Sequence, residues 1–98
     1  MSQVEIAPEV GDDFDRILDH LAMHDVTNSA ASIREIIAAL DVLETNPQIG
    51  RPAGGETREL IIGRGSRGYI ALYRYLLEID TVVVLAVRSR QEAGYKGI

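Results

Sequence analysis

Apolar residues in the first half of the chain recur with the period of a helix. Between residues 9 and 24 they fall three and four positions apart and line one side: Val10, Phe14, Ile17, Leu18 and Leu21. After a break at residues 25–29 comes a second stripe, which consists of Ile33, Ile36, Ile37, Leu40 and Leu43. The break is rich in helix-capping residue types, and Asn46-Pro47 ends the second helix. The short link predicts an antiparallel helical hairpin.

The second half of the chain changes to the two-residue period of strands. A loop with two prolines and three glycines spans residues 47–56. Three segments with the alternation and composition of strands follow it, at residues 58–62, 68–77 and 81–87. The links between them are short enough for hairpins, so these strands should be antiparallel. Residues 3–6 also alternate, which predicts a short strand before the helices.

The element order β-α-α-β-β-β predicts an α+β fold in two layers. The two helices must cover one face of the sheet to bury their apolar stripes, so we expect a helical hairpin packed on an antiparallel sheet. We expect the whole chain, residues 1–98, to form a single domain. The residues predicted to be largely buried are Leu18, Leu21, Ile33, Ile37, Leu40, Ile61, Leu72, Val83 and Leu85.

The composition is that of an ordinary globular domain, with 46% hydrophobic and 26% charged residues. The chain has no cysteine, which excludes disulfides, thiolate nucleophiles and cysteine-ligated metals. No apolar run approaches the roughly 20 residues that span a bilayer, so we expect no membrane association. The N-terminus lacks the basic start and apolar stretch of a signal peptide. A cytoplasmic location is therefore expected.

The net charge of −5 is unevenly distributed along the chain. Residues 1–50 carry ten acids and two arginines, a balance of −8, whereas residues 51–98 carry eight basic residues and five acids, a balance of +3. The second half can therefore present a basic surface on a molecule that is acidic as a whole.

Three stretches of the second half resemble the RelE/ParE toxin superfamily. They are residues 46–52 with Arg58-Glu59-Leu60, residues 68–75 (Gly-Tyr-Ile-Ala-Leu-Tyr-Arg-Tyr), and residues 84–95, which end in Arg-Ser-Arg-Gln-Glu-Ala-Gly-Tyr. Together, in this order and at this spacing, they resemble the loop, the central strand and the last strand with its tail. The predicted element order also matches the fold of the superfamily over nearly the full length of the chain.

The resemblance implies the toxin half of a type II toxin–antitoxin pair, of the kind associated with plasmid stabilisation. It also implies a hetero-oligomer with a cognate antitoxin, whose acidic, partly apolar segment would lie over the sheet and the helical hairpin. The superfamily contains two main activities. RelE-like members cut messenger RNA on the ribosome, and ParE-like members inhibit DNA gyrase without a known hydrolytic centre.

Messenger RNA cleavage needs cations around the scissile phosphate and a group that moves the proton of the 2′-hydroxyl. Arginine suits the first task because its planar fork of donors matches a phosphate. If the chain is a ribonuclease, the candidate catalytic residues are Arg64, Arg67, Arg88 and Arg90, with Tyr95 as either the proton carrier or a stacking platform. In the alternative without a catalytic role, these arginines are solvent-facing residues that pair with nearby acids or with the antitoxin.

Three features favour the gyrase inhibitor over the ribonuclease. Ser89 stands where many relatives have a histidine, and Ile70 stands where RelE-like enzymes carry an arginine. The isoelectric point near 4.9 is also low for a ribosome-binding protein. The leading hypothesis is therefore a ParE-like gyrase inhibitor whose target-binding residues are Arg67, Arg74, Arg88 and Arg90. A RelE-like ribonuclease and an inactive homologue that retains only antitoxin binding remain the alternatives.

Two other sequence patterns are typical of a metal site and of a phosphate-binding loop, but neither predicts such a site here. His20 and His24 lie one helical turn apart, a spacing that can hold a metal, but the sequence indicates no third ligand and their neighbours are acidic surface positions. The glycine-rich segment 63–68 joins two strands rather than leading into a helix, so the phosphate-loop mechanism does not apply. It is better described as a hairpin turn that carries two arginines.

Overall fold

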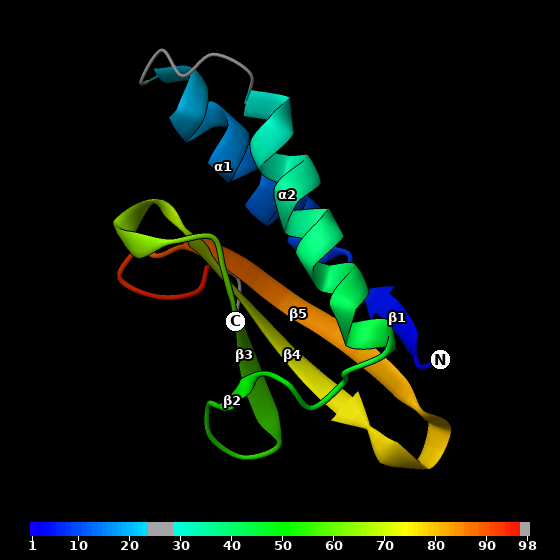
Figure 1. The fold of residues 1–98 in the computed structure, drawn as a ribbon. Helices are drawn as coiled ribbons and strands as arrows, with labels where there is room; N and C mark the ends of the chain where they lie inside the picture. Colours follow the sequence, from blue (N-terminus) through cyan, green and yellow to red (C-terminus); the bar gives the residue numbers. More distant parts are fainter. Residues whose placement is uncertain (24–28, 97–98) are drawn as a thin grey trace.

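The computed structural model describes residues 1–23 and 29–96. Two helices, α1 (Glu9–Met23) and α2 (Ser29–Asp41), lie together over one face of a sheet, and α2 continues into a short 3-10 turn at Val42–Glu44 (Figure 1). Both helices follow the predicted stripes, and the helical hairpin over a sheet confirms the predicted two-layer α+β fold. The predicted link at residues 25–28 lies outside the described residues.

The sheet has five strands in the order β1-β5-β4-β3-β2. Their bounds are β1 (Gln3–Ile6), β2 (Arg51–Pro52), β3 (Thr57–Ile62), β4 (Tyr69–Leu76) and β5 (Thr81–Ser89). The three long strands are antiparallel neighbours, as predicted. The sheet as a whole is mixed, because β1 pairs with β5 in the parallel direction. The loop predicted at residues 47–56 also contains a short strand, β2, which the glycines and prolines around it concealed in the sequence.

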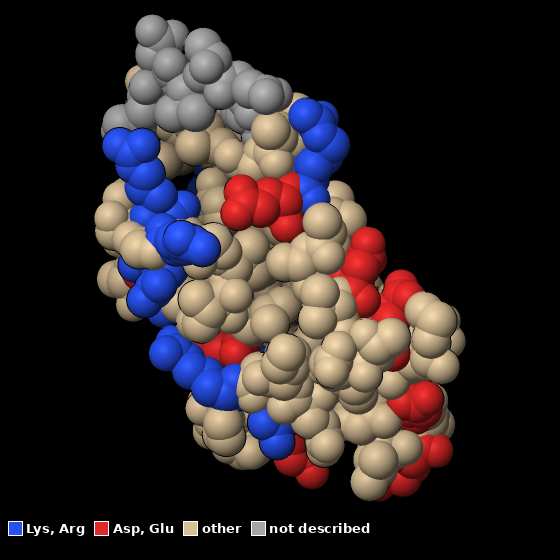
Figure 2. Space-filling view, in the orientation of Figure 1, with Lys and Arg blue, Asp and Glu red and all other residues tan. Residues whose placement is uncertain are grey.

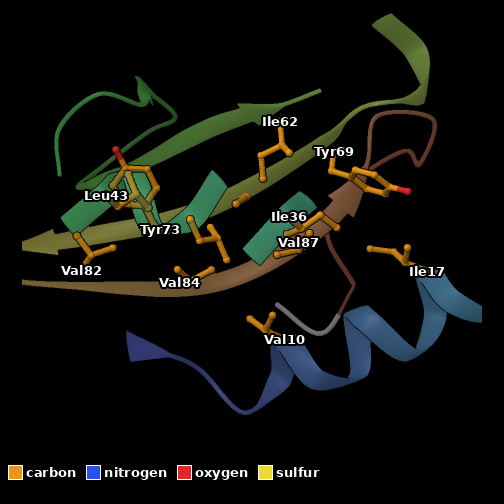
Figure 3. Close-up of a cluster of buried hydrophobic side chains, with 12 residues drawn as sticks. Val10, Ile17, Ile36, Leu43, Ile62, Tyr69, Tyr73, Val82, Val84 and Val87 are labelled. Carbon is orange, nitrogen blue, oxygen red and sulfur yellow. The ribbon is translucent and has the colours of Figure 1, made fainter. Parts of the chain in front are cut away.

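The core lies between the helices and the inner face of the sheet (Figure 3). Its largest fully buried side chain is Tyr73 of β4, and Val10 of α1, Ile36 of α2 and Val84 of β5 are also fully buried. Burying an aliphatic side chain of this size stabilises the fold by about 1.5–3 kcal/mol. Tyr73 also accepts a hydrogen bond from the backbone N–H of Gly50 at 2.8 Å, which fixes the loop before β2.

The predicted core was right in its location and wrong at two positions. Leu40 and Leu72 are buried, but Ile37 is 42% exposed and Ile61 is 37% exposed. In each case a neighbour faces the core instead, Ile36 in α2 and Ile62 in β3. Consecutive residues point in different directions in both kinds of element. The other five predicted core residues are half-buried: Leu18, Leu21, Ile33, Val83 and Leu85.

A β-bulge in β5 changes which residues face the helices. The register with β4 shifts between Leu72 and Tyr73, so that Leu72 pairs with Ala86 and Tyr73 pairs with Val84. Leu85 is the extra residue. Val84 and Val87 are three positions apart and would face opposite sides of a regular strand, but the bulge brings both into the core.

Candidate functional site

The residues predicted from sequence as a ribonuclease site divide between two places in the structure. Arg88 of β5 and Tyr95 of the tail meet on the outer face of the sheet, opposite the helices. There the guanidinium carbon of Arg88 lies 5.2 Å from the centre of the Tyr95 ring, within the range of a cation–π interaction. Arg64, Arg67 and Arg90 lie at the turn between β3 and β4 and in the tail next to it.

Glu59 of β3 lies at the centre of the outer-face group, and sequence reasoning had given it no role. The Tyr95 hydroxyl donates a hydrogen bond to Glu59 Oε2 at 2.5 Å. The Nε of Arg51 donates to Glu59 Oε1 at 3.1 Å. We call Arg51, Glu59, Arg88 and Tyr95 the outer-face cluster. A carboxylate therefore binds the hydroxyl of Tyr95, the residue that was expected to move a proton.

The protonation states in the outer-face cluster are fixed by these contacts. Burial, together with the hydrogen bond to Glu59, raises the pKa of Tyr95 well above its usual 10. The hydrogen bond from Tyr95 holds the pKa of Glu59 below its usual 4.5 against the opposing effect of burial, and Arg51 adds to the lowering. At neutral pH the phenol is protonated and the carboxylate is charged. Tyr95 is therefore unsuited to be a general base.

Arg88 is held by the chain around it rather than directed at solvent. Its Nη1 donates to the carbonyl oxygen of Glu92 at 2.8 Å and to that of Ser89 at 3.3 Å. Its Nε is buried and lacks a hydrogen-bond partner among the described residues. The Nη1 group of Arg88 thus holds the start of the tail through these two carbonyl oxygens.

Arg74 is separate from the other predicted target-binding residues. It lies near the far end of β4, in register with Thr57, whereas Tyr69 at the other end of β4 is in register with Ser89. Its Nη2 forms an ion pair with Glu56 at 2.5 Å. The structure thus does not bring Arg74 together with Arg67, Arg88 and Arg90.

Most of the exposed cations gather along one side of the molecule. The turn between β3 and β4 contains a short 3-10 segment, η2 (Gly65–Arg67), and the backbone N–H of Arg90 donates to Gly68 O at 3.0 Å, which ties the tail to this turn. Figure 2 shows Lys and Arg along the side where Figure 1 places this turn and the tail, and Asp and Glu mainly on the opposite side. We call the exposed residues of the turn and tail the basic edge: Arg64, Arg67, Arg90 and Lys96.

A groove of about 720 Å³ separates the basic edge from the helices. Arg16 and His20 of α1, Ser32 of α2, Arg67 of the turn and Gln91 of the tail lie along it, and the side chains of Ile17, Leu21 and Tyr69 form its apolar part. His24, the other histidine considered as a metal ligand, lies outside the described residues. Residues 1–23 and 29–96 contain no group of three or more side chains suited to hold a metal ion.

A second set of charged residues that the sequence reading missed joins α1 to the end of β5. Asp13 is only 2% exposed and accepts a hydrogen bond from Val87 N at 2.9 Å. Arg16 bridges Asp13 and Glu92 at 2.7 and 2.6 Å. A signal existed, because Asp13 lies three residues after Val10 and four before Ile17, on the apolar stripe itself.

The arrangement therefore offers one closed site and one open surface. In the outer-face cluster each side chain is engaged by its neighbours, and a negative charge lies at its centre. Along the basic edge the arginines are exposed and the groove beside them is open. Such a surface can bind an acidic partner, whereas cleavage of a phosphodiester needs a proton acceptor next to converging cations.

Comparisons with known proteins agree with the fold. Residues 4–94 match the family described as the ParE toxin of type II toxin–antitoxin system, parDE. A chromosomal ParDE toxin–antitoxin system from P. aeruginosa contains a chain of similar structure, with a TM-score of 0.74 and 19% identity over 91% of this chain and 96% of that one. A second similar structure is the archaeal RelE–RelB complex from Pyrococcus horikoshii OT3, with a TM-score of 0.55 and 18% identity over 94% and 98% of the two chains. No curated protein matches the sequence.

Proposed function

The chain belongs to the ParE toxin family of type II toxin–antitoxin systems, and from this premise we propose that it inhibits DNA gyrase by binding it, in the cytoplasm, without cleaving RNA. The match covers residues 4–94, nearly the whole chain. The two activities of the wider superfamily require different surfaces. Inhibition by binding requires a complementary exposed surface, and RNA cleavage requires groups that transfer a proton beside a phosphate.

The position of Glu59 is the observation that carries this proposal. Its carboxylate, charged at neutral pH, is hydrogen-bonded to Tyr95 and lies in the same cluster as Arg88. A phosphate brought to these residues would be repelled by the charge of Glu59, whose carboxylate already accepts hydrogen bonds from Tyr95 and Arg51. The other cations considered as catalytic, Arg64, Arg67 and Arg90, lie on the basic edge rather than in the outer-face cluster with Arg88 and Tyr95.

The basic edge provides the binding surface in this proposal. Its cations are exposed and lie on two neighbouring segments, the turn before β4 and the tail after β5. Exposed charges of one sign steer association with an acidic surface and fix its orientation. The net charge of the whole chain is negative, so the attraction is local to this side of the molecule.

Two assays on the purified toxin test the proposal. One measures DNA supercoiling by gyrase, and the other measures cleavage of messenger RNA on translating ribosomes. We expect loss of supercoiling and intact messenger RNA. Cleavage of ribosome-bound RNA by the wild type that disappears in Tyr95→Phe would instead show a RelE-like ribonuclease. Absence of both activities would leave an inactive homologue that retains antitoxin binding.

Substitutions on the basic edge locate the binding surface. The double variant Arg67→Ala/Arg90→Ala removes two exposed cations, and we expect it to lose gyrase inhibition while it remains folded. Arg88 is a less suitable target because its side chain holds the tail. Arg34→Ala, which removes an exposed arginine from α2, is the matched control and should inhibit as the wild type does.

We also propose that a cognate antitoxin neutralises the toxin in a hetero-oligomer. The two similar structures are of a toxin–antitoxin system and of a toxin–antitoxin complex. An acidic, partly apolar segment would suit the groove between the helices and the basic edge, because the exposed Arg67 lies along it beside the apolar side chains of Ile17, Leu21 and Tyr69. Co-expression with the neighbouring reading frame, followed by size exclusion, should give one co-eluting species. Two separately eluting stable monomers would contradict this partner.

A further inference from the structure

The side chains of α1 complete the hydrogen bonding of β5 where its neighbouring strand ends. β1 pairs with β5 only as far as Val84. Three residues later, Val87 N donates to the buried carboxylate of Asp13 at 2.9 Å, and Val87 O accepts a hydrogen bond from Arg16 Nη2 at 3.2 Å. Asp13 and Arg16 thus take the place of a strand at this edge. Arg16 is further fixed by its 2.7 Å ion pair with Asp13.

Glu92 extends this arrangement to the tail. Its Oε1 accepts a hydrogen bond from Arg16 Nε at 2.6 Å, and its Oε2 accepts from Arg16 Nη2 at 3.2 Å and from Ser89 N at 2.8 Å. The carboxylate therefore closes the turn at residues 89–92 and attaches it to α1. The side chains of Arg16 and Glu92 are only 28% and 22% exposed, so solvent screens the pair less than it screens a surface ion pair.

The contacts of Glu92 determine where the cations of the tail lie. The residues after β5 form turns and bends rather than a helix or strand, so specific contacts rather than a regular hydrogen-bond ladder hold them. The backbone carbonyl of Glu92 accepts from Arg88 Nη1 at 2.8 Å. Between them lies Arg90, whose backbone N–H binds the turn that carries Arg67. Displacement of Glu92 would break its contacts with Ser89 N and with Arg88, which hold the tail next to Arg90.

We propose that the Arg16–Glu92 ion pair is a clasp that positions the basic edge, because it holds the tail against α1 and so keeps Arg90 next to the turn that carries Arg67. Arg16 and Glu92 are positioning residues in this proposal and do not themselves touch the target. The inference rests on the proposed role of the basic edge in binding a target. It adds that target binding depends on the contact between Arg16 and Glu92 at the start of the tail.

The test compares Glu92→Gln with a matched control, Glu56→Gln. Both variants remove one negative charge from an ion pair with an arginine, but Glu56 pairs with Arg74 at 2.5 Å, away from the tail. Hydrogen–deuterium exchange measures protection of residues 88–96, thermal unfolding measures the stability of the domain, and growth arrest on induction measures toxicity whatever the target is. Loss of a charge-assisted hydrogen-bond pair of this kind should speed exchange of the tail about tenfold.

We expect faster exchange in the tail and weaker growth arrest in Glu92→Gln, at temperatures where both variants are fully folded, and neither change in Glu56→Gln. Unchanged protection of residues 88–96 in Glu92→Gln would overturn the proposal. A loosened tail with undiminished growth arrest would also overturn it, because Arg90 would then not need the clasp. Wild-type growth arrest without gyrase inhibition would refute the proposed target and leave this comparison valid.

Discussion

Gly68, at the entrance to β4, is required by the space around it rather than by its backbone conformation. Its φ of −77° is open to any residue, but an added Cβ would lie 2.5 Å from the carbonyl oxygen of Ile62. This oxygen belongs to the backbone of β3 and cannot rotate away. The hairpin turn that carries Arg64 and Arg67 of the basic edge therefore requires a residue without a side chain at position 68.

We predict that Gly68→Ala destabilises the domain by about 1–3 kcal/mol, as overpacking of a tight site does. Urea denaturation followed by circular dichroism measures the change. Gly11→Ala is the matched control, because an added Cβ on α1 meets nothing within 4 Å and alanine favours a helix by up to about 1 kcal/mol over glycine. Equal stability of Gly68→Ala and the wild type would show that the turn yields at no cost.

Glu59 should make stability depend on pH in the acidic range. Its folded pKa lies below the ordinary 4.5, chiefly because Tyr95 donates a hydrogen bond to it. The unfolded chain therefore binds the proton more readily, so the contribution of Glu59 is complete above about pH 4.5 and is lost as the pH falls through the folded pKa. We predict that Glu59→Gln is less stable than the wild type at pH 7 and that this difference shrinks below pH 4.5. A difference that stays constant from pH 7 to pH 3 would contradict the assignment.

At the scale of elements, α1 supports the sheet through polar contacts as well as apolar ones. Val10 and Ile17 pack into the core, and between them Asp13 binds the backbone of β5. The helix thereby satisfies a strand edge that would otherwise leave a buried N–H without a partner, which costs about 1–3 kcal/mol.

We predict that Asp13→Ala destabilises the domain by about 2–3 kcal/mol, because it leaves the buried Val87 N without its partner and removes one of the two ion pairs of Arg16. Asp13→Asn keeps an acceptor of the same shape and should lose less. Asp15→Ala, an exposed acid on the same helix, should change stability by no more than about 0.5 kcal/mol. Chemical denaturation of the three variants ranks them. Similar losses for Asp13→Ala and Asp15→Ala would refute the structural role of Asp13.

At the scale of the whole molecule, charge is divided between two sides. The acidic first half forms β1 and both helices, and the more basic second half forms the remaining strands and the tail. Folding places exposed cations of the second half along one side, opposite most of the acids (Figure 2). None of the described helices is long and apolar enough to cross a membrane.

We predict that association of the toxin with its antitoxin slows about tenfold from low to high salt, because the basic edge steers an acidic partner and salt screens exposed charges. Stopped-flow or surface plasmon resonance measures the rates, and dissociation should change less than association. The variant Arg67→Ala/Arg90→Ala should flatten this salt dependence, and Arg34→Ala should leave it steep. An association rate that is insensitive to salt would mean that the basic edge takes no part.

The sequence by itself determined the fold class and most of the elements. Local periodicity decides these features, because a helix or strand must bury one side of its own sequence, as the stripes through Val10 and Ile36 do. Periodicity also placed most of the arginines on the strands and turns where they lie. It was less accurate at Ile37 and Ile61, because the edge of an apolar stripe does not reveal which of two neighbours faces the core.

The tertiary structure alone decided the rest. Three features join segments that are remote in the sequence or depend on the register between strands. They are the bulge at Leu85, the parallel pairing of β1 and the hydrogen bond from Tyr95 to Glu59. No local pattern encodes such a distance. The role of Asp13 was decided in the same way, since a carboxylate on an apolar stripe can be accommodated only when a distant backbone supplies its partner.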